Sequence, residues 1–220
     1  YIDTSARYGN GASELNIGTV MQERRGEVFL ASKSHDYTYD GTMALFEQSL
    51  RRLQTDYLDL YQHHFVGGHG QLEQLQQKDS ARQAFERLRD EGLIRYIGVT
   101  GHSSRVLADA LEDCSFELVG FALNPTRERM EDPEDLDRFF RLAQEKGVGV
   151  IAMKVVGDGE LVKQGFDMRQ LLRYALSYPI STAIVGISTL SHLEENVPIA
   201  SAFEPLSEEE ITEIRALAQS

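Results

Sequence analysis

Short apolar runs alternate along the whole chain with stretches in which apolar residues recur at helical spacing. The apolar runs predict seven strands, over residues 1–3, 28–32, 57–62, 94–99, 118–123, 148–153 and 182–185. This alternation is typical of repeated strand–helix units that build a parallel sheet.

Helix boundaries can be read from the residues between these strands. Ser207 and Glu210 form a capping-box pattern ahead of a C-terminal helix. Asp132 and Pro133 suit an N-cap and a first helical position. The apolar stripe expected to be buried behind them comprises Leu136, Phe139, Phe140 and Ala143.

The strand count favours a (β/α)8 barrel over an open sheet. The chain starts at Tyr1 in what looks like the tail of a strand, so we expect a barrel whose first strand–helix unit and upstream sequence are missing. A doubly wound sheet would carry a glycine-rich dinucleotide turn after its first strand, and the sequence has none there. We therefore predict one domain over residues 1–220.

Charge and cysteine content exclude several kinds of partner. The chain has 22 basic and 35 acidic residues, a formal net charge of −13, which repels nucleic acid and anionic membrane surfaces. Cys114 is the single cysteine, so neither an internal disulfide nor a site with several thiolate ligands can form. No apolar stretch approaches the roughly 20 residues of a membrane span. We expect a soluble, cytoplasmic protein without nucleic-acid or membrane partners.

Chemically matched side chains fall at the ends of the first three predicted strands: Asp3, Tyr8, Lys33, His63 and His64. Active sites of parallel barrels lie at the carboxyl ends of the strands, where these residues would converge. A tyrosine donates a proton efficiently at neutral pH only if a nearby cation stabilises its phenolate, and Lys33 is that cation. Asp3 balances the lysine, and a neutral imidazole polarises a carbonyl oxygen. The hydride for carbonyl reduction must come from a cofactor.

Each residue also has an ordinary structural explanation. Tyr8 alone could be a packing residue, Lys33 could extend to the surface, and Asp3 could cap a helix. The two histidines could be one core and one surface residue, or metal ligands. Adjacent residues on a strand point to opposite faces, so His63 and His64 cannot readily grip one metal together.

The motifs around these residues are long and specific. They comprise Asp3-Thr4-Ser5, Tyr8-Gly9, Ser13-Glu14, residues 29–33, Ser49-Leu50, Arg52-Leu53, residues 55–61 leading to His64, residues 184–188, Leu193 and Glu194-Glu195-Asn196. Together they resemble the aldo-keto reductase superfamily over almost the whole chain.

The resemblance implies a (β/α)8 barrel that binds NADPH at its carboxyl-end face. Its catalytic tetrad maps onto Asp3, Tyr8, Lys33 and His64. Tyr8 would be the general acid, tuned by Lys33 and Asp3. His64, chosen over His63 by alignment to the family, would position the substrate carbonyl.

The nicotinamide end of the implied cofactor site departs from the family pattern. Thr100 and Gly101 stand where many members have a serine–asparagine pair, Gly120 replaces a glutamine, and Met153 replaces an aromatic residue. Thr100 keeps a hydroxyl, and Met153 can still make a sulfur–ring contact. Lys154, at a strand end, has two open interpretations: contact with cofactor phosphate, or a simple ion pair across the barrel mouth.

The remaining implied cofactor residues lie near the C-terminus. Gly186 to Ser188 match the path of the phosphates and ribose, and Glu195 and Asn196 match adenine contacts. His192 stands where an arginine often grips the 2′-phosphate, and an imidazole is the weaker phosphate partner. The resemblance implies NADP(H) ahead of NAD(H) and leaves both open.

We therefore predict an NAD(P)H-dependent oxidoreductase that reduces an aldehyde or ketone to an alcohol, or runs the reverse reaction, without a metal. Two alternatives are a regulatory or sensor protein that binds nucleotide with little turnover, and a metal-dependent hydrolase built on Asp3, His63 and His64. The substrate and the oligomeric state stay open, because residues 66–78 show no interpretable binding feature.

Overall fold

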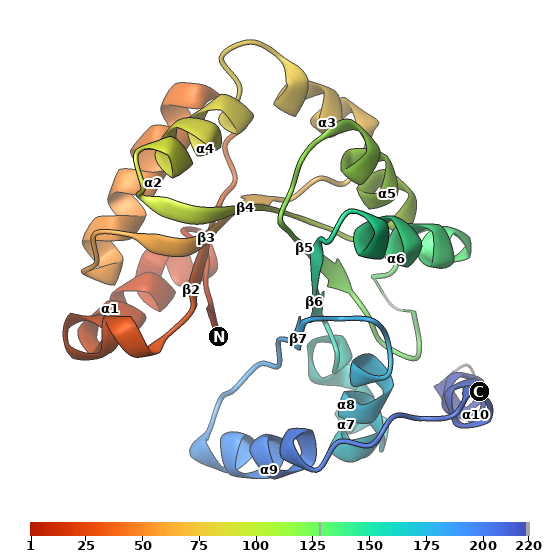
Figure 1. The fold of residues 1–220 in the computed structure, drawn as a ribbon. Helices are drawn as coiled ribbons and strands as arrows, with labels where there is room; N and C mark the ends of the chain where they lie inside the picture. Colours follow the sequence, from red (N-terminus) through yellow and green to blue (C-terminus); the bar gives the residue numbers. More distant parts are fainter. Residues whose placement is uncertain (128, 219–220) are drawn as a thin grey trace. The chain divides into compact units, whose positions relative to one another are not determined.

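The computed structural model describes residues 1–127 and 129–218 (Figure 1). Contacts within the chain cluster into two compact units. The first comprises Tyr1–Gly101 with Asp109–Val119, and the second comprises His102–Ala108 with Gly120–Ser220. Each unit is described by itself.

The strands follow the order of the sequence. They are β1 (Ile2–Asp3), β2 (Leu30–Ser34), β3 (Leu58–His64), β4 (Ile94–Gly101), β5 (Leu118–Ala122), β6 (Gly149–Met153) and β7 (Thr182–Ala183), in sheet order β1 to β7. The pairs β1–β2, β2–β3, β3–β4 and β6–β7 are parallel. The predicted alternation of strands and helices with parallel pairing is confirmed.

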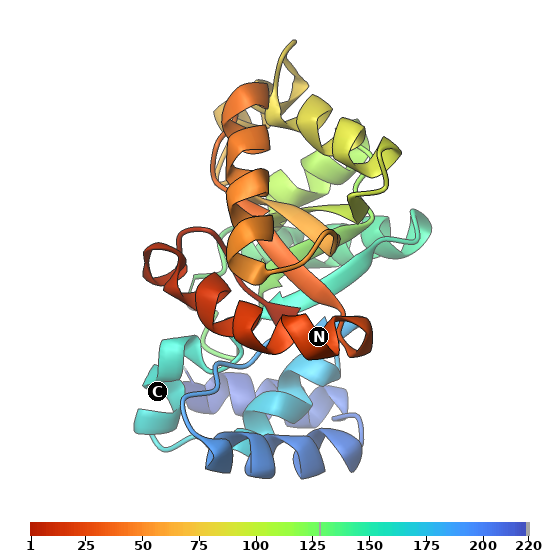
Figure 2. The same ribbon diagram turned by 90° about the vertical axis from the view of Figure 1, so that its left-hand side faces the viewer.

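Helices of the first unit cover one face of β2 to β4 (Figures 1 and 2). They are α1 (Ala12–Arg24), α2 (Tyr39–Leu53), α3 (His69–Gln76) and α4 (Ala81–Asp90), with short 3-10 turns η1 (Tyr8–Gly11) and η2 (Arg25–Glu27). Thr38 caps α2 by accepting a hydrogen bond from the Gly41 amide at 3.1 Å. The buried ring of Tyr61 lies between Phe46 and Phe85, with centroids 5.2 and 5.0 Å away. This aromatic cluster fixes α2 and α4 on the outer face of β3.

Three strands reach further toward their carboxyl ends than predicted. β2 ends at Ser34, β3 at His64 and β4 at Gly101, so Lys33 and both histidines lie within strands. The runs of apolar residues end earlier, but the backbone hydrogen-bond ladder continues and pairs Lys33 with Gln62 and His64 with Thr100. Polar side chains extend a strand here because neighbours on both sides satisfy its backbone.

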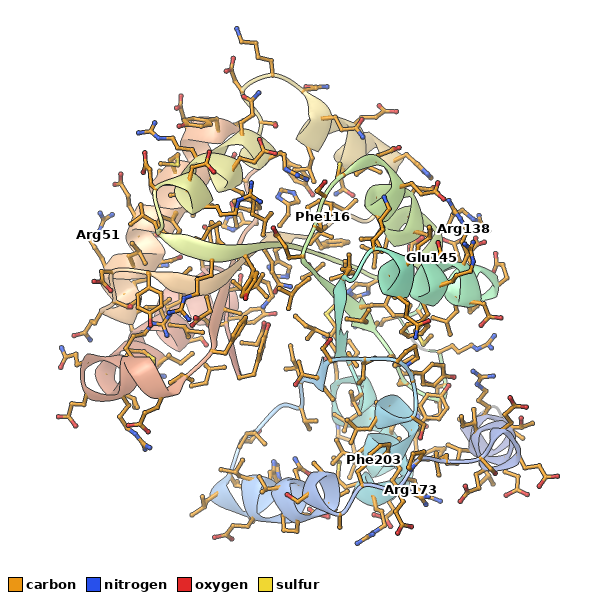
Figure 3. The ribbon with its side chains drawn as sticks, in the orientation of Figure 1. Arg51, Phe116, Arg138, Glu145, Arg173 and Phe203 are labelled. Atoms are coloured by element: carbon orange, nitrogen blue, oxygen red, sulfur yellow. The ribbon has the colours of Figure 1, made fainter. Side chains whose placement is uncertain are left out.

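The second unit contains β6, β7 and the remaining helices, and β5 is divided between the two units. Its helices are α6 (Leu136–Glu145), α7 (Glu160–Lys163), α8 (Met168–Leu176), α9 (Leu190–Ser201) and α10 (Glu208–Ala218), with 3-10 turns η3 (Pro133–Asp135) and η4 (Gly157–Gly159), while α5 (Ser104–Asp113) belongs partly to each unit. The Ser207–Glu210 capping box is confirmed, with backbone-to-side-chain hydrogen bonds of 2.7 and 3.2 Å. In Figure 3, Arg173 extends from α8, and its Nε donates to the Glu204 carbonyl at 3.0 Å.

Pro133 begins the 3-10 turn η3 that leads directly into α6, as predicted, and the buried stripe is confirmed, but the predicted cap by the Asp132 side chain is wrong. Asp132 has a φ of 52° and makes no side-chain cap. Its carboxylate is instead bonded to the hydroxyl of Ser103, and α6 begins at Leu136 after the 3-10 turn. The Asp132 carboxylate thus bonds Ser103, which is distant in the sequence, instead of capping the adjacent helix. Among the described residues, no helix has the length and hydropathy needed to cross a membrane.

Candidate active site

Lys33 and Asp3 form a buried ion pair at the carboxyl ends of β2 and β1. The Lys33 Nζ lies 2.5 Å from the Asp3 Oδ2 and also donates to the Thr4 carbonyl at 2.8 Å. The two charged side chains are 3% and 9% exposed. In such surroundings water screens charge weakly, so this pair acts strongly on whatever lies next to it.

Tyr8 is that neighbour. The Lys33 Nζ lies 5.1 Å from the centroid of its ring. The loop turns sharply after Tyr8, with left-handed φ values of 58° at Gly9 and 53° at Asn10, a conformation that these two residue types tolerate. Tyr8 is 41% exposed. A partly exposed tyrosine thus has a buried cation near its ring.

The charge state of Lys33 depends on two carboxylates. Burial lowers the pKa of Lys33 below its usual value, and Asp3 and then Glu14 offset part of that shift. A buried ammonium keeps its charge when a carboxylate is hydrogen-bonded to it, as Asp3 is here. The second oxygen of Asp3, Oδ1, is buried and accepts no hydrogen bond from the described residues.

His64, at the end of β3, completes the cluster. Its Nδ1 lies 3.1 Å from the Ser5 Oγ, and its ring meets the Tyr8 ring edge-on, with centroids 5.7 Å apart and planes at 85°. Ser5 therefore fixes the orientation of the imidazole beside the phenol. The structure brings together all four residues of the predicted tetrad.

His63 lies in different surroundings. It is fully buried, with the Tyr37 ring 4.4 Å and the Phe85 ring 6.2 Å from its own. Burial, and secondarily His64, lowers the pKa of His63 to about 3, so the ring is neutral. Neither nitrogen has a hydrogen-bond partner among the described residues. His63 is a core residue, and the hydrolase hypothesis loses its histidine pair.

Metal ligation finds no other support in the described part of the chain. No group of three or more histidine, cysteine, aspartate or glutamate residues there could hold an ion.

Sequence reasoning gave no role to Glu14, which is buried on α1 beside this centre. Glu14, Gly18 and Met21 form the buried face of that helix. A carboxylate on the same helical face as Gly18 and Met21 was the signal that could have identified it.

Thr100 lies at the end of β4, also in the first unit. Its hydroxyl donates to the His63 carbonyl at 3.1 Å, and its own carbonyl accepts from the Val66 amide at 2.8 Å. The hydroxyl hydrogen is therefore used within the sheet. Only the oxygen lone pairs are left for a cofactor amide.

In the second unit, Met153 and Lys154 follow one another at the end of β6. The Met153 carbonyl accepts from the Leu123 amide at 2.9 Å. The Lys154 Nζ lies 2.5 Å from the Asp158 Oδ1, and its side chain is 32% exposed. Lys154 therefore forms a local ion pair, with a residue four positions later in the chain, and a phosphate would have to share or displace Asp158.

The last cofactor candidates gather around the start of α9. The Ser188 amide donates to the His192 Nδ1 at 3.4 Å, and Glu195 and Asn196 follow three and four residues later, on the same helical face. The Asn196 Oδ1 is buried without a hydrogen-bond partner among the described residues. Gly186 is exposed, and nothing lies within 4 Å of where its Cβ would be.

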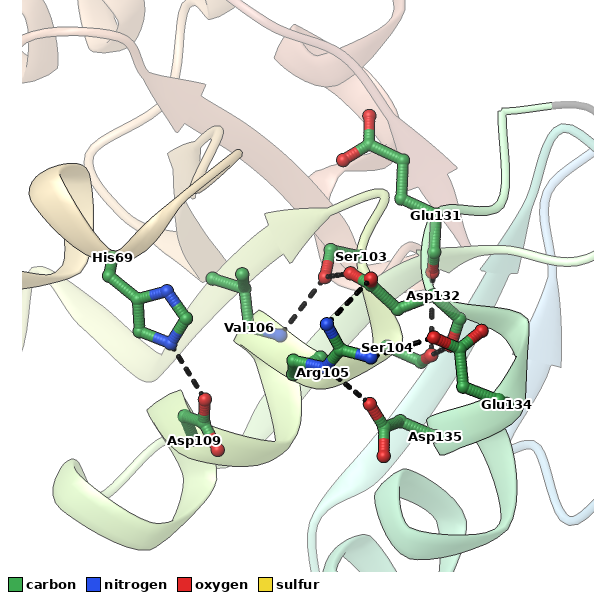
Figure 4. A network of polar contacts seen from close by, with 10 residues as sticks. All are labelled: His69, Ser103, Ser104, Arg105, Val106, Asp109, Glu131, Asp132, Glu134 and Asp135. Carbon is green, nitrogen blue, oxygen red and sulfur yellow. Dashed lines mark hydrogen bonds and ion pairs between the residues drawn. The ribbon is translucent and has the colours of Figure 1, made fainter.

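A second charged cluster surrounds Arg105 at the start of α5 (Figure 4). Its guanidinium contacts Asp132 at 3.2 Å, Glu134 at 2.7 Å and Asp135 at 2.6 Å. The Ser103 Oγ accepts from the Val106 amide at 3.0 Å, so Ser103 caps the start of α5. The cluster ties the segment before α6 to α5.

The parallel strand–helix units and the buried lysine–carboxylate pair beside a tyrosine define a class, the α/β-barrel oxidoreductases that use a nicotinamide cofactor. The model of the aldo/keto reductase family matches residues 1–171, and the chain belongs to this family. The predicted fold class and family are thereby confirmed, and the chain is an NAD(P)-dependent oxidoreductase.

Several known proteins are similar over nearly the whole chain. The uncharacterized oxidoreductase YqkF of Bacillus subtilis is 27% identical, and the match covers 98% of this chain and 82% of YqkF. The holo form of aldo-keto reductase AKR11C1 from Bacillus halodurans superimposes with a TM-score of 0.78 at 25% identity, covering 100% of this chain and 83% of that one. An aldo-keto reductase from Klebsiella pneumoniae, solved in complex with NADPH, has a TM-score of 0.74 at 24% identity, covering 99% and 79%.

Proposed function

We propose that this protein reduces an aldehyde or ketone to an alcohol, or catalyses the reverse oxidation, with Tyr8 as the general acid and NADP(H) ahead of NAD(H) as cofactor. One observation carries the proposal. Tyr8 lies with its ring near the Lys33 ammonium and edge-on to His64, while Asp3 balances the lysine.

Proton delivery follows from this arrangement. In reduction, the Tyr8 hydroxyl donates its proton to the developing alkoxide oxygen of the substrate. The phenolate left behind is stabilised by the ammonium of Lys33, which lies in a site screened little by water. General acid catalysis of this kind contributes about 10²–10⁴ in rate.

His64 orients the substrate. The Ser5 hydroxyl engages its Nδ1, which sets the direction of the other ring nitrogen. With its ring held edge-on to Tyr8, His64 would use that nitrogen to polarise the same carbonyl oxygen that receives the proton. His64 thus aligns the carbonyl, and Tyr8 protonates it.

The nicotinamide cofactor supplies the hydride when bound. Residues of the second unit fit its adenosine end: the Asn196 Oδ1 is buried without a partner among the described residues, and Gly186 leaves room for a close backbone approach. His192 would face the 2′-phosphate or ribose, and Glu195 the adenine. Thr100 offers lone pairs at the nicotinamide end, with Met153 and Lys154 as further candidates. The Klebsiella relative bound to NADPH supports this choice of cofactor.

The test removes a single oxygen atom. Tyr8→Phe deletes the acidic hydroxyl and keeps the ring, so kcat for carbonyl reduction should fall by about 10²–10⁴. Binding of NADPH, followed by its fluorescence, should stay within about twofold, because the lost hydroxyl acts on the substrate. Turnover is read at the nicotinamide absorbance band with a panel of aldehydes and ketones, and parallel titrations with NADPH and NADH compare the two cofactors.

Tyr96→Phe is the matched control. Tyr96 is 42% exposed, close to the 41% of Tyr8, and its loss of a hydroxyl should leave kcat unchanged. Full activity in Tyr8→Phe would reject the proposed acid. Binding of nucleotide by the wild type without turnover of any carbonyl compound would reject the proposed reaction.

A further inference from the structure

Glu14 is a fully buried carboxylate on the first turn of α1. Its Oε1 accepts a hydrogen bond from the Ser32 Oγ at 2.7 Å, and its Oε2 lies 3.3 Å from the Arg52 Nη1. Ser32 directly precedes Lys33 in β2. Both oxygens are therefore fixed, one of them by the strand that carries the catalytic lysine.

Arg52 is turned inward from α2. Its neighbour Arg51 points away from the fold in Figure 3 and is 70% exposed, whereas the Arg52 side chain is 23% exposed. A Cβ at Gly11 would overlap the Arg52 guanidinium, and one at Gly18 would overlap the Arg52 carbonyl oxygen. These two glycines leave the space in which Arg52 reaches Glu14.

The same contacts hold the loop that carries Tyr8. The Arg52 Nη1 lies 3.5 Å from the Ala6 carbonyl. The hydroxyls of Thr4 and Ser13 are 2.8 Å apart and join the two ends of the loop. The Thr4 carbonyl accepts from the Lys33 Nζ. The acid, its cation and Glu14 are thus linked through short covalent and hydrogen-bonded connections.

A buried ion pair is a poor device for stability alone, since apolar side chains of similar volume often stabilise a fold as well or better. Glu14 accepts a hydrogen bond from Ser32, the residue before Lys33, and Arg52 contacts the loop that carries Tyr8. These contacts indicate that the pair affects the active site.

We propose that Glu14, held by Arg52, is a positioning residue for the Tyr8–Lys33 centre: it fixes the Tyr8 loop against β2 and supplies a second negative charge to Lys33. The proposal rests on the proposed function, because it assigns Tyr8 and Lys33 their roles. Electrostatics agrees, since Glu14 raises the pKa of Lys33 against the larger lowering by burial.

Several charged or titratable groups surround the centre. They are Asp3 on β1, Tyr1 before it, Glu14 on α1, Arg52 on α2 and His64 on β3. Replacing Glu14 by glutamine makes the local potential more positive, because the cations stay. A more positive potential favours proton loss from both Tyr8 and Lys33, so the first ionisation of this coupled pair moves to lower pH.

The test compares Glu14→Gln with Glu23→Gln. Both variants lose one negative charge from α1, but Glu23 is exposed. In Glu14→Gln, the alkaline limb of the kcat profile for reduction should move to lower pH by about 0.5–1 unit. In Glu23→Gln, it should stay where it is in the wild type.

A second readout needs no substrate. Tyrosines labelled at the ring Cζ report phenol ionisation by NMR, and Tyr8→Phe assigns the Tyr8 signal. The first ionisation should shift in Glu14→Gln by the same amount as the kinetic limb. If the wild type shows no carbonyl reduction, the kinetic measurement rejects the proposed function. The NMR titration still shows whether Glu14 changes the ionisation of Tyr8 and Lys33.

A double variant separates positioning from folding. Glu14→Gln with Arg52→Met removes both charges, so the melting temperature should recover relative to Glu14→Gln alone. Because the Arg52 cation is removed together with the Glu14 carboxylate, the local potential returns toward that of the wild type, so the first ionisation should lie between those of Glu14→Gln and the wild type. An unshifted ionisation in Glu14→Gln, or activity that recovers fully with stability in the double variant, would reduce Glu14 to a structural role and overturn the proposal.

Discussion

The charged centre around Lys33 and the one around Arg105 differ far more in exposure than in their number of contacts. Arg105 meets three carboxylates but is 45% exposed. Lys33 meets one carboxylate, and that pair is 3% and 9% exposed. Water and salt screen the first cluster and barely reach the second.

This difference decides what each centre can do. Around Arg105, solvent compensates for any lost partner, so the cluster anchors a segment at little cost. Around Lys33, each charge is held by a small set of fixed groups, and changing one alters the proton affinity of the others. Density of ion pairs is therefore a poor guide to chemistry, whereas burial is a good one.

The largest effect is expected from Lys33→Met. This change removes the cation that stabilises the phenolate and strands the Asp3 carboxylate, so kcat should fall at least about 100-fold and the free energy of unfolding by about 3 kcal/mol. Urea unfolding and the reductase assay measure the two effects. Adding Asp3→Asn removes the stranded charge and should restore much of the stability without restoring activity. Recovery of both together would mean that the pair serves folding alone.

An intermediate effect is expected from His63→Leu, which adds to the comparison a buried titratable group that packs against aromatic rings. The pKa of His63 is lowered from 6.5 in the unfolded chain to about 3, so the unfolded state binds more protons between these values. Wild-type stability is fully present above pH 6.5 and falls toward pH 3, by up to about 1.4 kcal/mol per pH unit. Urea unfolding at pH 7 and pH 4.5 should show a smaller loss in the leucine variant. His63→Met, with a side chain of different shape, should show the same reduced loss of stability between pH 7 and pH 4.5 as His63→Leu. An equal loss in the wild type and both variants would contradict the prediction.

The smallest effect is expected from Arg105→Gln. Exposed ion pairs add little to stability, so the melting temperature should fall by no more than about 2 °C. The difference should vanish at high salt, and carbonyl reduction should be unchanged. A large, salt-independent loss would show that exposure does not separate the two centres.

Sequence reasoning predicted the cluster of Asp3, Tyr8, Lys33 and His64 because the carboxyl ends of parallel strands meet at one edge, whatever the details of packing. The position at which a strand ends cannot be predicted in this way. Lys33 and His64 were expected just past the ends of their strands, but they lie within them. The end of a strand is set by backbone hydrogen bonding to its neighbours and not by the run of apolar residues.

Other misses have a tertiary origin. Asp132 prefers a helix cap locally, but the hydroxyl of Ser103 and the guanidinium of Arg105 provide partners that only the fold supplies. Lys154 had two interpretations because the reach to Asp158 depends on a left-handed turn, with φ 59° at Lys154 itself. No role was predicted for Glu14, because the burial of its carboxylate depends on two partners that are distant in the sequence, Ser32 and Arg52.

The close approach of α1 to α2 at Gly11 and Gly18 limits how this protein can be altered. Any larger residue at either position must displace Arg52, so a change on the outside of the sheet would disturb the buried Glu14. Leu15 and Val20, 53% and 47% exposed on the same helix, face no such obstacle. Engineering of α1 for solubility should therefore vary these two side chains and keep both glycines.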